Sequence, residues 1–295
     1  MSPTYSSPVT VCRPALPRDT AEVKQFCKFI WDGHDYVPYV WPEWLADPRG
    51  QLVVAEYAGH TVGLAKVTLL APGQWWLEGF RVDPQFQGLK IGSHINQYLN
   101  DWWLEQGDGV VRLMTSSERV QVHHLSEKLG YSRIGAVEKH SAPALAQPTD
   151  AFQPVPKSEL QQALAFAQRS PSLALSHGLM DLGWQFLRPD ASVLAGFAAE
   201  SHLWWWRGKQ GVLAAQDDDE DGDKTLYLCL LACQTEALSD LLQDARRLAA
   251  QLAYQSACWV APQGQMVLEA LKQAGYELEW DHPGVLYERL HPVRG

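Results

Sequence analysis

The alternation of apolar and polar residues predicts two kinds of element along the first half of the chain. Apolar residues at i, i+3, i+4 and i+7 mark one face of a helix, and short apolar runs bounded by turn signals mark strands. The pattern reads as a strand, a helix, three strands, a helix, a strand and a helix, with one further short helix before the second strand. We expect strands at 10–14, 52–57, 62–69, 74–82 and 110–115, and helices at 19–31, around 41–45, at 93–105 and at 118–129.

One of these strands leads into a helix through a loop that contains glycines. Successive strand residues alternate between the two faces of a sheet. Strand 74–82 should therefore present Leu77, Gly79 and Arg81 on one face, and Glu78, Phe80 and Val82 on the other. Asp83-Pro84 ends the strand, and apolar residues return at helical spacing after Ser93. The segment 87–93 thus joins a strand to the N-terminus of a helix.

The chemistry of segment 87–93 suits an anion. Gly88 and Gly92 let the backbone come close to a ligand. The unpaired amides of the first helical turn, with the helix dipole behind them, favour a phosphate or pyrophosphate. A glycine-containing turn without a ligand is the alternative interpretation, because short patterns of this kind recur by chance. The segment consists of Gln87, Gly88, Leu89, Lys90, Ile91, Gly92 and Ser93.

A proline-spaced segment separates two halves that share a pattern. We expect a first domain at 1–145, a proline-rich linker at 146–157 and a second domain at 158–295. In the second half a long helix, a strand and another helix end at Gly275-Tyr276, as the helix at 118–129 ends at Gly130-Tyr131. The second half is therefore predicted to be a degenerate copy of the first. Its strand at 226–232 enters the next helix without a glycine, so no phosphate-binding loop is expected there.

Composition narrows the class of protein. A hydrophobic fraction of 46% and thirteen tryptophans in 295 residues are enough for packed cores. The net charge of −10 argues against a nucleic-acid partner, because phosphate backbones are bound by clustered lysine and arginine. Neither a signal sequence nor an apolar run long enough for a membrane span is evident. We therefore expect a soluble, cytoplasmic protein without a membrane partner.

Two sets of residues could be mistaken for metal ligands. The five cysteines are odd in number and lack paired ligand spacing, so we interpret them as reduced thiols. The acidic run 217–223 begins like a calcium-binding EF-hand loop, but its twelfth position is Leu228 instead of glutamate. A solvated hairpin loop is the preferred interpretation of this run, and no metal site is predicted.

The loop and three further segments resemble a known family. A strand followed by Val-x-Pro and a glycine loop resembles the acetyl-CoA site of the GNAT acetyltransferase superfamily, whose loop reads Arg/Gln-Gly-x-Gly-x-Gly. This chain reads Gln87-Gly88-Leu89-Lys90-Ile91-Gly92, so Lys90 replaces the middle glycine and could meet a phosphate as a point charge. Within the superfamily, the chain resembles the vertebrate histidine N-acetyltransferase family in three ordered segments, Asp35-Tyr36-Val37-Pro38, Trp44-Leu45-Ala46-Asp47-Pro48 and Glu78-Gly79-Phe80-Arg81-Val82-Asp83-Pro84.

The resemblance implies a fold and an activity. The fold would be α/β (α+β), with a mixed, mostly antiparallel sheet flanked by helices and a second, degenerate GNAT-like domain. The activity would be acetyl-CoA-dependent N-acetylation of a small amine, such as a free amino acid, by direct transfer. Two alternatives remain open: a non-catalytic sensor that binds acyl-CoA or an amino acid, and a protein N-acetyltransferase. The oligomeric state is left open as well.

The resemblance also implies roles for individual residues. Backbone groups of Phe80, Arg81 and Val82 would pair with the pantetheine arm, and Glu78 would act as the base, with a structural carboxylate as the alternative. Ser126 stands where many members place a tyrosine acid, and His123 and His124 lie one turn away. For the substrate, the resemblance points to Asp35 holding a cation and to aromatic contacts from Tyr36 and Trp41, with packing under a loop as the alternative.

Overall fold

The computed structural model describes residues 9–220 and 223–292 and divides them into two compact units. Unit 1 comprises the described residues up to Leu113, His124–Tyr131, and those from Glu288 onward. Unit 2 comprises Met114–His123 and Ser132–Tyr287. Both units therefore draw on more than one stretch of sequence. The boundaries expected at 145 and 158 follow the proline spacing, and they stay a prediction.

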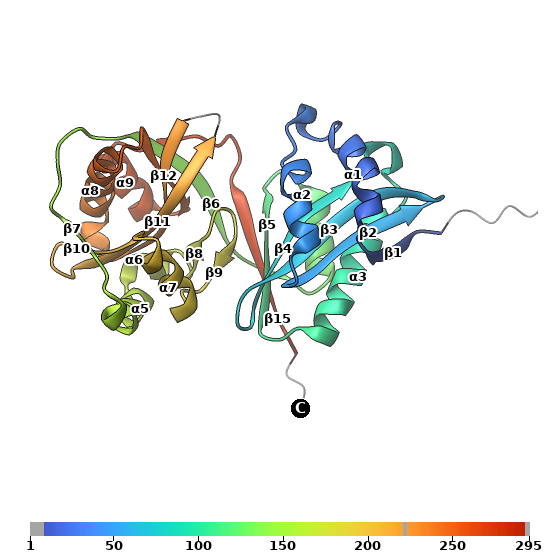
Figure 1. The fold of residues 1–295 in the computed structure, drawn as a ribbon, viewed down its shortest axis with the longest axis horizontal. Coiled ribbons are helices and arrows are strands. Elements are labelled where there is room, and N and C mark those ends of the chain that lie inside the picture. The colour runs from blue at the N-terminus through green and yellow to red at the C-terminus, as the bar shows by residue number, and fades with distance from the viewer. Residues whose placement is uncertain (1–8, 221–222, 293–295) are drawn as a thin grey trace, which may run out of the picture. The chain divides into compact units, whose positions relative to one another are not determined.

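Unit 1 is built on a sheet whose strands follow their order in the chain (Figure 1). The neighbours β1 to β4 pair antiparallel, and β4 pairs with β5 in parallel. The last residues of β5 and the first residues of α4 belong to unit 2. The strands are β1 (Val11–Pro14), β2 (Gly50–Tyr57), β3 (His60–Ala71), β4 (Gln74–Val82) and β5 (Val110–Ser116), and the helices are α1 (Thr20–Cys27), α2 (Val37–Ala46), α3 (Ile91–Gln106) and α4 (Val120–Lys128).

Helices cover both faces of this sheet. On one face α1 and α2 form a buried cluster with β2 and β3, in which Trp41 and Leu64 are fully buried. On the other face, α3 brings Ile91 and Ile95 against Gly63 of β3. A Cβ atom on Gly63 would lie 2.8 Å from Ile95 Cδ1, so only glycine lets α3 approach the sheet this closely.

Unit 2 holds a second mixed sheet in the order β6-β13-β12-β11-β10-β7, in which β12 and β13 pair in parallel. The amphipathic helix α8 packs its apolar face, with Leu241, Leu242 and Leu248, into the core of this unit. The strands are β6 (Ser132–Pro143), β7 (Phe152–Pro154), β8 (Met180–Asp181), β9 (Phe186–Leu187), β10 (Leu203–Trp206), β11 (Gly211–Glu220), β12 (Asp223–Cys233), β13 (Ser256–Pro262), β14 (Glu277–Leu278) and β15 (Gly284–Leu290), and the last residues of β15 belong to unit 1. The helices are α5 (Leu160–Arg169), α6 (Pro171–Leu175), α7 (Ala191–Ala199), α8 (Leu238–Gln251) and α9 (Gln265–Ala274).

Three local expectations are corrected by the structure. The helix expected at 19–31 ends at Cys27, and a 3-10 turn with left-handed backbone at Trp31 and Asp32 follows it. The short helix expected near 41–45 begins at Val37, because Pro38 fits the first turn of a helix. Of the acidic run 217–223, residues 217–220 lie in β11 and Asp223 begins β12, while positions 221–222 of the predicted hairpin loop lie outside the described residues.

Candidate active site

The pairing between β4 and β5 ends before β4 does. Its parallel pairing with β5 spans Gln74–Trp76 and Val110–Arg112. On its other edge, β4 stays paired with β3 as far as Val82. The backbone of residues 77–82 thus lies beyond the paired part of β5, where an extended ligand could bind it.

A β-bulge changes which side chains β4 presents. Glu78 lies opposite Lys66 and Arg81 lies opposite Leu64, so two residues of β4 share one partner on β3. Gly79, at a φ of +68°, supplies the left-handed backbone of this bulge. Lys66 and Leu64 share a face, and Glu78 and Arg81 therefore share that face too. The alternation expected from the sequence is wrong here, although a glycine inside a strand is a known sign of a bulge.

The N-terminus of α3 lies against the far end of β4. A Cβ atom on Gly92 would lie 2.9 Å from the ring tip of Phe80 and 3.7 Å from Val82. Ile91 is buried, while Gln87, Gly88, Leu89, Lys90 and Ser93 are exposed. No side chain caps this helix at Lys90. The first amides of α3 therefore lack helical acceptors at an exposed loop, which is the arrangement that accommodates phosphate groups.

Lys90 has the backbone conformation of the glycine that it replaces. Its φ is +60° and its ψ is 14°, in the left-handed region, and it directly precedes the first helical residue. Gly88 has a φ of +82° with no atom within 4 Å of a Cβ built on it. A side chain in the left-handed region costs roughly 1 kcal/mol, so the loop keeps its shape at a modest energetic penalty.

Glu78 sits in a network of hydrogen bonds. The Thr68 hydroxyl donates to Glu78 Oε1 at 3.0 Å and accepts from Lys66 Nζ. Lys66, which is only 1% exposed, also donates to Asp47 Oδ2 at 2.8 Å. Lys66 and Thr68 were missed by sequence reasoning. The available signal was their presence as two polar residues two positions apart in the otherwise apolar stretch 62–71.

Asp35 and Arg81 form a buried ion pair. Arg81 donates from Nε and Nη2 to the two carboxylate oxygens of Asp35, each at 3.0 Å. The Asp35 side chain is fully buried and also accepts from the Val37 amide. The Arg81 guanidinium lies 4.2 Å from the ring centroid of Trp31 and 5.2 Å from that of Tyr36. A cationic substrate could reach Asp35 only if this pair opened.

Tyr36 and Trp41 differ in their access to solvent. Tyr36 is 39% exposed and packs edge-on against Trp44. Burial of its phenol raises the pKa of Tyr36 to about 12; the Arg81 guanidinium opposes this shift, and the carboxylates of Glu78 and Asp35 add to it. Trp41 is fully buried and donates from Nε1 to the Thr20 hydroxyl at 3.0 Å. A substrate ring could contact Trp41 only if α2 moved.

The residues considered for the acid have different surroundings. Ser126 is buried in unit 1. His124 is exposed, also in unit 1. His123 belongs to unit 2, where its ring nitrogens lie 2.9 Å from the Tyr287 hydroxyl and 3.2 Å from the Ser117 carbonyl. The Tyr36 phenol, which was not considered for the acid, lies within electrostatic range of Glu78.

Strand β12 of unit 2 is arranged like β4 of unit 1, but residues of unit 2 itself bond the backbone at its end. β12 pairs with β13 over Thr225–Tyr227, and a bulge follows on its β11 side. Beyond that point Ser172 accepts from the Cys233 amide at 2.8 Å and donates to the Leu231 carbonyl at 2.9 Å. Ser170 donates to the Cys233 carbonyl at 2.8 Å. The end of β12 is thus occupied by the start of α6.

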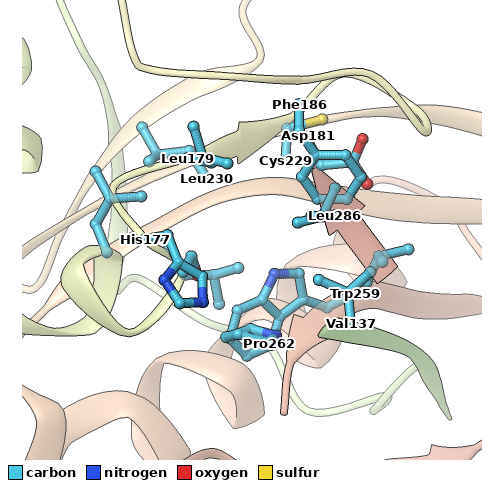
Figure 2. A pocket seen from close by; sticks show the side chains of 14 residues that line it. Val137, His177, Leu179, Asp181, Phe186, Cys229, Leu230, Trp259, Pro262 and Leu286 are labelled. Carbon is cyan, nitrogen blue, oxygen red and sulfur yellow. The ribbon is translucent and has the colours of Figure 1, made fainter. Parts of the chain in front are cut away.

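A small pocket lies beside these strands in unit 2 (Figure 2). Figure 2 shows the His177 imidazole and the Asp181 carboxylate on opposite sides of the Trp259 indole. Asp181 accepts from the Gln185 amide and from the Tyr227 hydroxyl, and burial raises the pKa of Asp181 to about 7. This carboxylate holds the β8–β9 turn. The pocket contains none of the residues predicted for cofactor or substrate binding.

The described residues contain neither a cluster of metal ligands nor a membrane-spanning helix. Across 9–220 and 223–292, no group of three or more His, Cys, Asp or Glu side chains is arranged to hold a metal ion. Within the same ranges, no helix combines the length and the apolar character needed to span a membrane.

The chain is similar to acetyltransferases in sequence and in fold. Residues 19–131 match the model of the acetyltransferase (GNAT) family. These residues form a GNAT acetyltransferase domain. The chain is 26% identical over 209 residues to human Probable N-acetyltransferase 16. That match covers 64% of this chain and 57% of the human protein, so the chain spans little more than half of its relative's length.

Solved structures extend the likeness to both halves. A GCN5-related N-acetyltransferase from Sphaerobacter thermophilus superposes with a TM-score of 0.64 at 14% identity, over 95% of each chain. A tandem GNAT protein from the clavulanic acid biosynthesis pathway superposes with a TM-score of 0.61 at 10% identity, over 97% of this chain and 100% of that one. Identities this low speak for the fold alone. They confirm the predicted GNAT fold, with tandem GNAT neighbours that cover the whole chain.

Proposed function

We propose that the GNAT domain transfers the acetyl group of acetyl-CoA to the nitrogen of a small amine. The loop from Gln87 to Ser93 would hold the pyrophosphate, and the backbone of Phe80, Arg81 and Val82 would pair with the pantetheine arm. The observation that carries the proposal is that β4 continues past the end of its pairing with β5, beside the N-terminus of α3, where Lys90 provides no side-chain cap. An extended chain ending in a pyrophosphate matches both features.

Glu78 would act as the base, directly or through a water. An ammonium cannot attack a thioester until it has lost a proton, and a positioned carboxylate can accept that proton. The neutral nitrogen then attacks the carbonyl carbon, the C–N bond forms, and the C–S bond breaks. The nitrogen loses a second proton as the amide forms, and water can relay this proton to the leaving thiolate, since thiol pKa values lie at about 8.5.

Tyr36 would help to bind the amine. With its pKa raised to about 12, its hydroxyl stays protonated at neutral pH and can donate a hydrogen bond. Two further exposed aromatic residues are near it in the chain: Trp31, before α2, is 46% exposed, and Tyr39, in the first turn of α2, is 84% exposed. These aromatic surfaces suit a substrate with an apolar or aromatic side chain, including a free amino acid. Asp35 would position β4 through Arg81 in this conformation.

A thiol-release assay with a panel of free amines tests the proposal. Glu78→Gln should keep acetyl-CoA affinity within a few-fold of the parent, because the amide preserves the shape of the side chain. Turnover should fall on the order of 100-fold, the usual contribution of positioned proton transfer. Glu43→Gln, a change of the same charge at an exposed position of α2, is the matched control and should leave turnover unchanged.

The outcomes separate the competing functions. Acetyl-CoA binding without turnover of any amine would favour a sensor. Turnover confined to peptide N-termini or lysines would favour a protein N-acetyltransferase. Normal turnover of the Glu78→Gln variant would make Glu78 structural and remove it from the proposal.

A further inference from the structure

A buried lysine lies behind the proposed base. Lys66 is 1% exposed and Thr68 is 2% exposed, both on the β3 face that Glu78 shares. Lys66 Nζ lies 2.5 Å from Thr68 Oγ1 and 2.8 Å from Asp47 Oδ2, and Thr68 Oγ1 lies 3.0 Å from Glu78 Oε1. An ammonium this deeply buried is destabilising unless it is paired. Its position therefore needs an explanation beyond packing.

The direction of the hydrogen bonds supplies that explanation. The ammonium has three donors and no acceptor, so the Thr68 oxygen must accept from Lys66. The Thr68 proton is then directed to Glu78, and the nearby positive charge strengthens this bond. Asp47 holds Lys66 in place and is itself bound by Arg49, at 2.9 Å from Arg49 Nε to Asp47 Oδ1.

We infer that Lys66 and Thr68 are positioning residues that hold the Glu78 carboxylate ionised and in a fixed orientation for proton transfer. The inference rests on the proposed function, since it assigns a purpose to the partners of the proposed base. Asp47, from the Asp-Pro that follows α2, completes the chain of four residues. Neither Lys66 nor Thr68 needs to touch the substrate or acetyl-CoA.

The charges around Glu78 come from three elements besides its own strand. β3 contributes the Lys66 ammonium, and the residues after α2 contribute Asp47 and Arg49. The start of α2 contributes Tyr36 and Asp35, and β4 itself contributes Arg81. Asp35 and Arg81 pair with each other, as do Asp47 and Arg49. Thr68 accepts from Lys66 and donates to Glu78, so its hydroxyl links the lysine to the carboxylate.

Direct titration of Glu78 tests the inference without relying on activity. The full-length chain carrying ¹³C-labelled glutamate side chains would be titrated by NMR, with Glu78→Gln assigning the signal. Thr68→Val removes the donor at nearly constant volume and should raise the Glu78 midpoint by about one pH unit, because a donor to the charged form is lost. The rising limb of kcat/KM against pH should move by the same amount, and Thr68→Ser should restore both.

A control on the same strand separates this effect from general damage. Thr61 is also buried on β3, but its hydroxyl donates to Asp19 Oδ1, at 3.3 Å. Thr61→Val should leave the Glu78 midpoint unchanged. Lys66→Met should shift that midpoint in the same direction as Thr68→Val. If Lys66→Met does not fold, Thr68→Val still decides the matter.

The outcomes distinguish the inference from the proposed function. An unmoved Glu78 midpoint in Thr68→Val overturns the inference, whatever the activity of the parent. A shifted midpoint in a parent that acetylates no amine supports the network while the proposed function fails. A shifted midpoint together with a shifted kcat/KM limb supports both.

Discussion

Strands β4 of unit 1 and β12 of unit 2 begin alike and end differently. Each pairs in parallel with the next strand over three residue pairs, and each has a bulge soon afterwards. The pair before the bulge is Glu78 opposite Lys66 in unit 1, and Leu228 opposite Ala215 in unit 2. The proposed base and its lysine are thus matched by two buried apolar residues.

The segments that follow the two strands also differ in how well they suit an anionic ligand. β4 leads through Gly88 and Lys90 into the first turn of α3, which contains Gly92 and no acidic residue. β12 leads through Gln234 into a 3-10 turn with Glu236, and α8 has Asp240 in its first turn. Carboxylates there repel a pyrophosphate, and Ser170 and Ser172 already bond the backbone of β12. The strand geometry is kept in unit 2 while each group suited to a CoA ligand is replaced.

The largest effect is expected from removing the bulge of unit 1. Gly79→Ala should lower the free energy of unfolding by about 4 kcal/mol, because the backbone is left-handed and the new Cβ would lie 2.4 Å from the Trp44 ring. Gly59→Ala is the control: its φ of +85° is also left-handed, but no atom lies within 4 Å. It should lose only about 1 kcal/mol. Urea unfolding measures both, and equal losses would show that the bulge tolerates a side chain.

The next effect tests the ion pair between Lys66 and Asp47. The position that matches Lys66 in unit 2 is Ala215. Asp47→Asn leaves the Lys66 ammonium buried without its partner and should lower stability by about 3 kcal/mol near neutral pH. Hydrogen bonds from Arg49 and Lys66 outweigh burial and hold the pKa of Asp47 well below its usual range. Its contribution is therefore complete above about pH 5 and is lost as the pH falls below about 4.

The difference between parent and Asp47→Asn should accordingly shrink on acidification. Unfolding in urea at a series of pH values between about 3 and 7 measures it. Asp101→Asn, at an exposed position of α3, should show no such trend. A gap that stayed constant with pH would contradict the ion pair as the source of the stability.

The third prediction concerns how many ligands each chain binds. Calorimetry should give one acetyl-CoA per chain, and acetyl-CoA at about a hundred times its Kd should stabilise the protein by about 2.7 kcal/mol. Gly92→Val should abolish acetyl-CoA binding and the stabilisation that comes with it, since the valine side chain would meet Phe80 between the loop and β4. Gly264→Val, before α9 of unit 2 and in open space, should leave binding intact. Two bound ligands per chain would refute the contrast between the strands.

The smallest effect is expected at Lys90. Lys90→Gly should raise stability by up to about 1 kcal/mol, because glycine adopts the left-handed conformation without strain. Acetyl-CoA should still bind. If the lysine meets a phosphate, the dependence of affinity on salt should become shallower. Melting curves and titrations at two salt concentrations measure these effects, and a loss of binding would assign Lys90 a larger part in the site.

Much of the GNAT domain is predictable because local patterns decide it. The strand 74–82 and the helix after the loop follow from period-two and helical spacing, and the helix observed at Ile91–Gln106 lies close to the one expected at 93–105. The same spacing predicts α8 and α9 in the second half. Gly88 also lies where the pattern puts it, between β4 and α3, whereas Gly92 already belongs to the first turn of α3.

What only the tertiary structure decided involves residues that are far apart in the chain. Arg81 pairs with Asp35 across 46 positions, and Lys66 reaches Asp47 across 19, so no local spacing announces either contact. The bulge at Gly79 turned Glu78 and Arg81 to one face, against the simple alternation. The sequence by itself determined the elements and the loop, because those depend on neighbouring residues. The surroundings of Glu78 depend on which strand and helix meet it, and packing alone determines that.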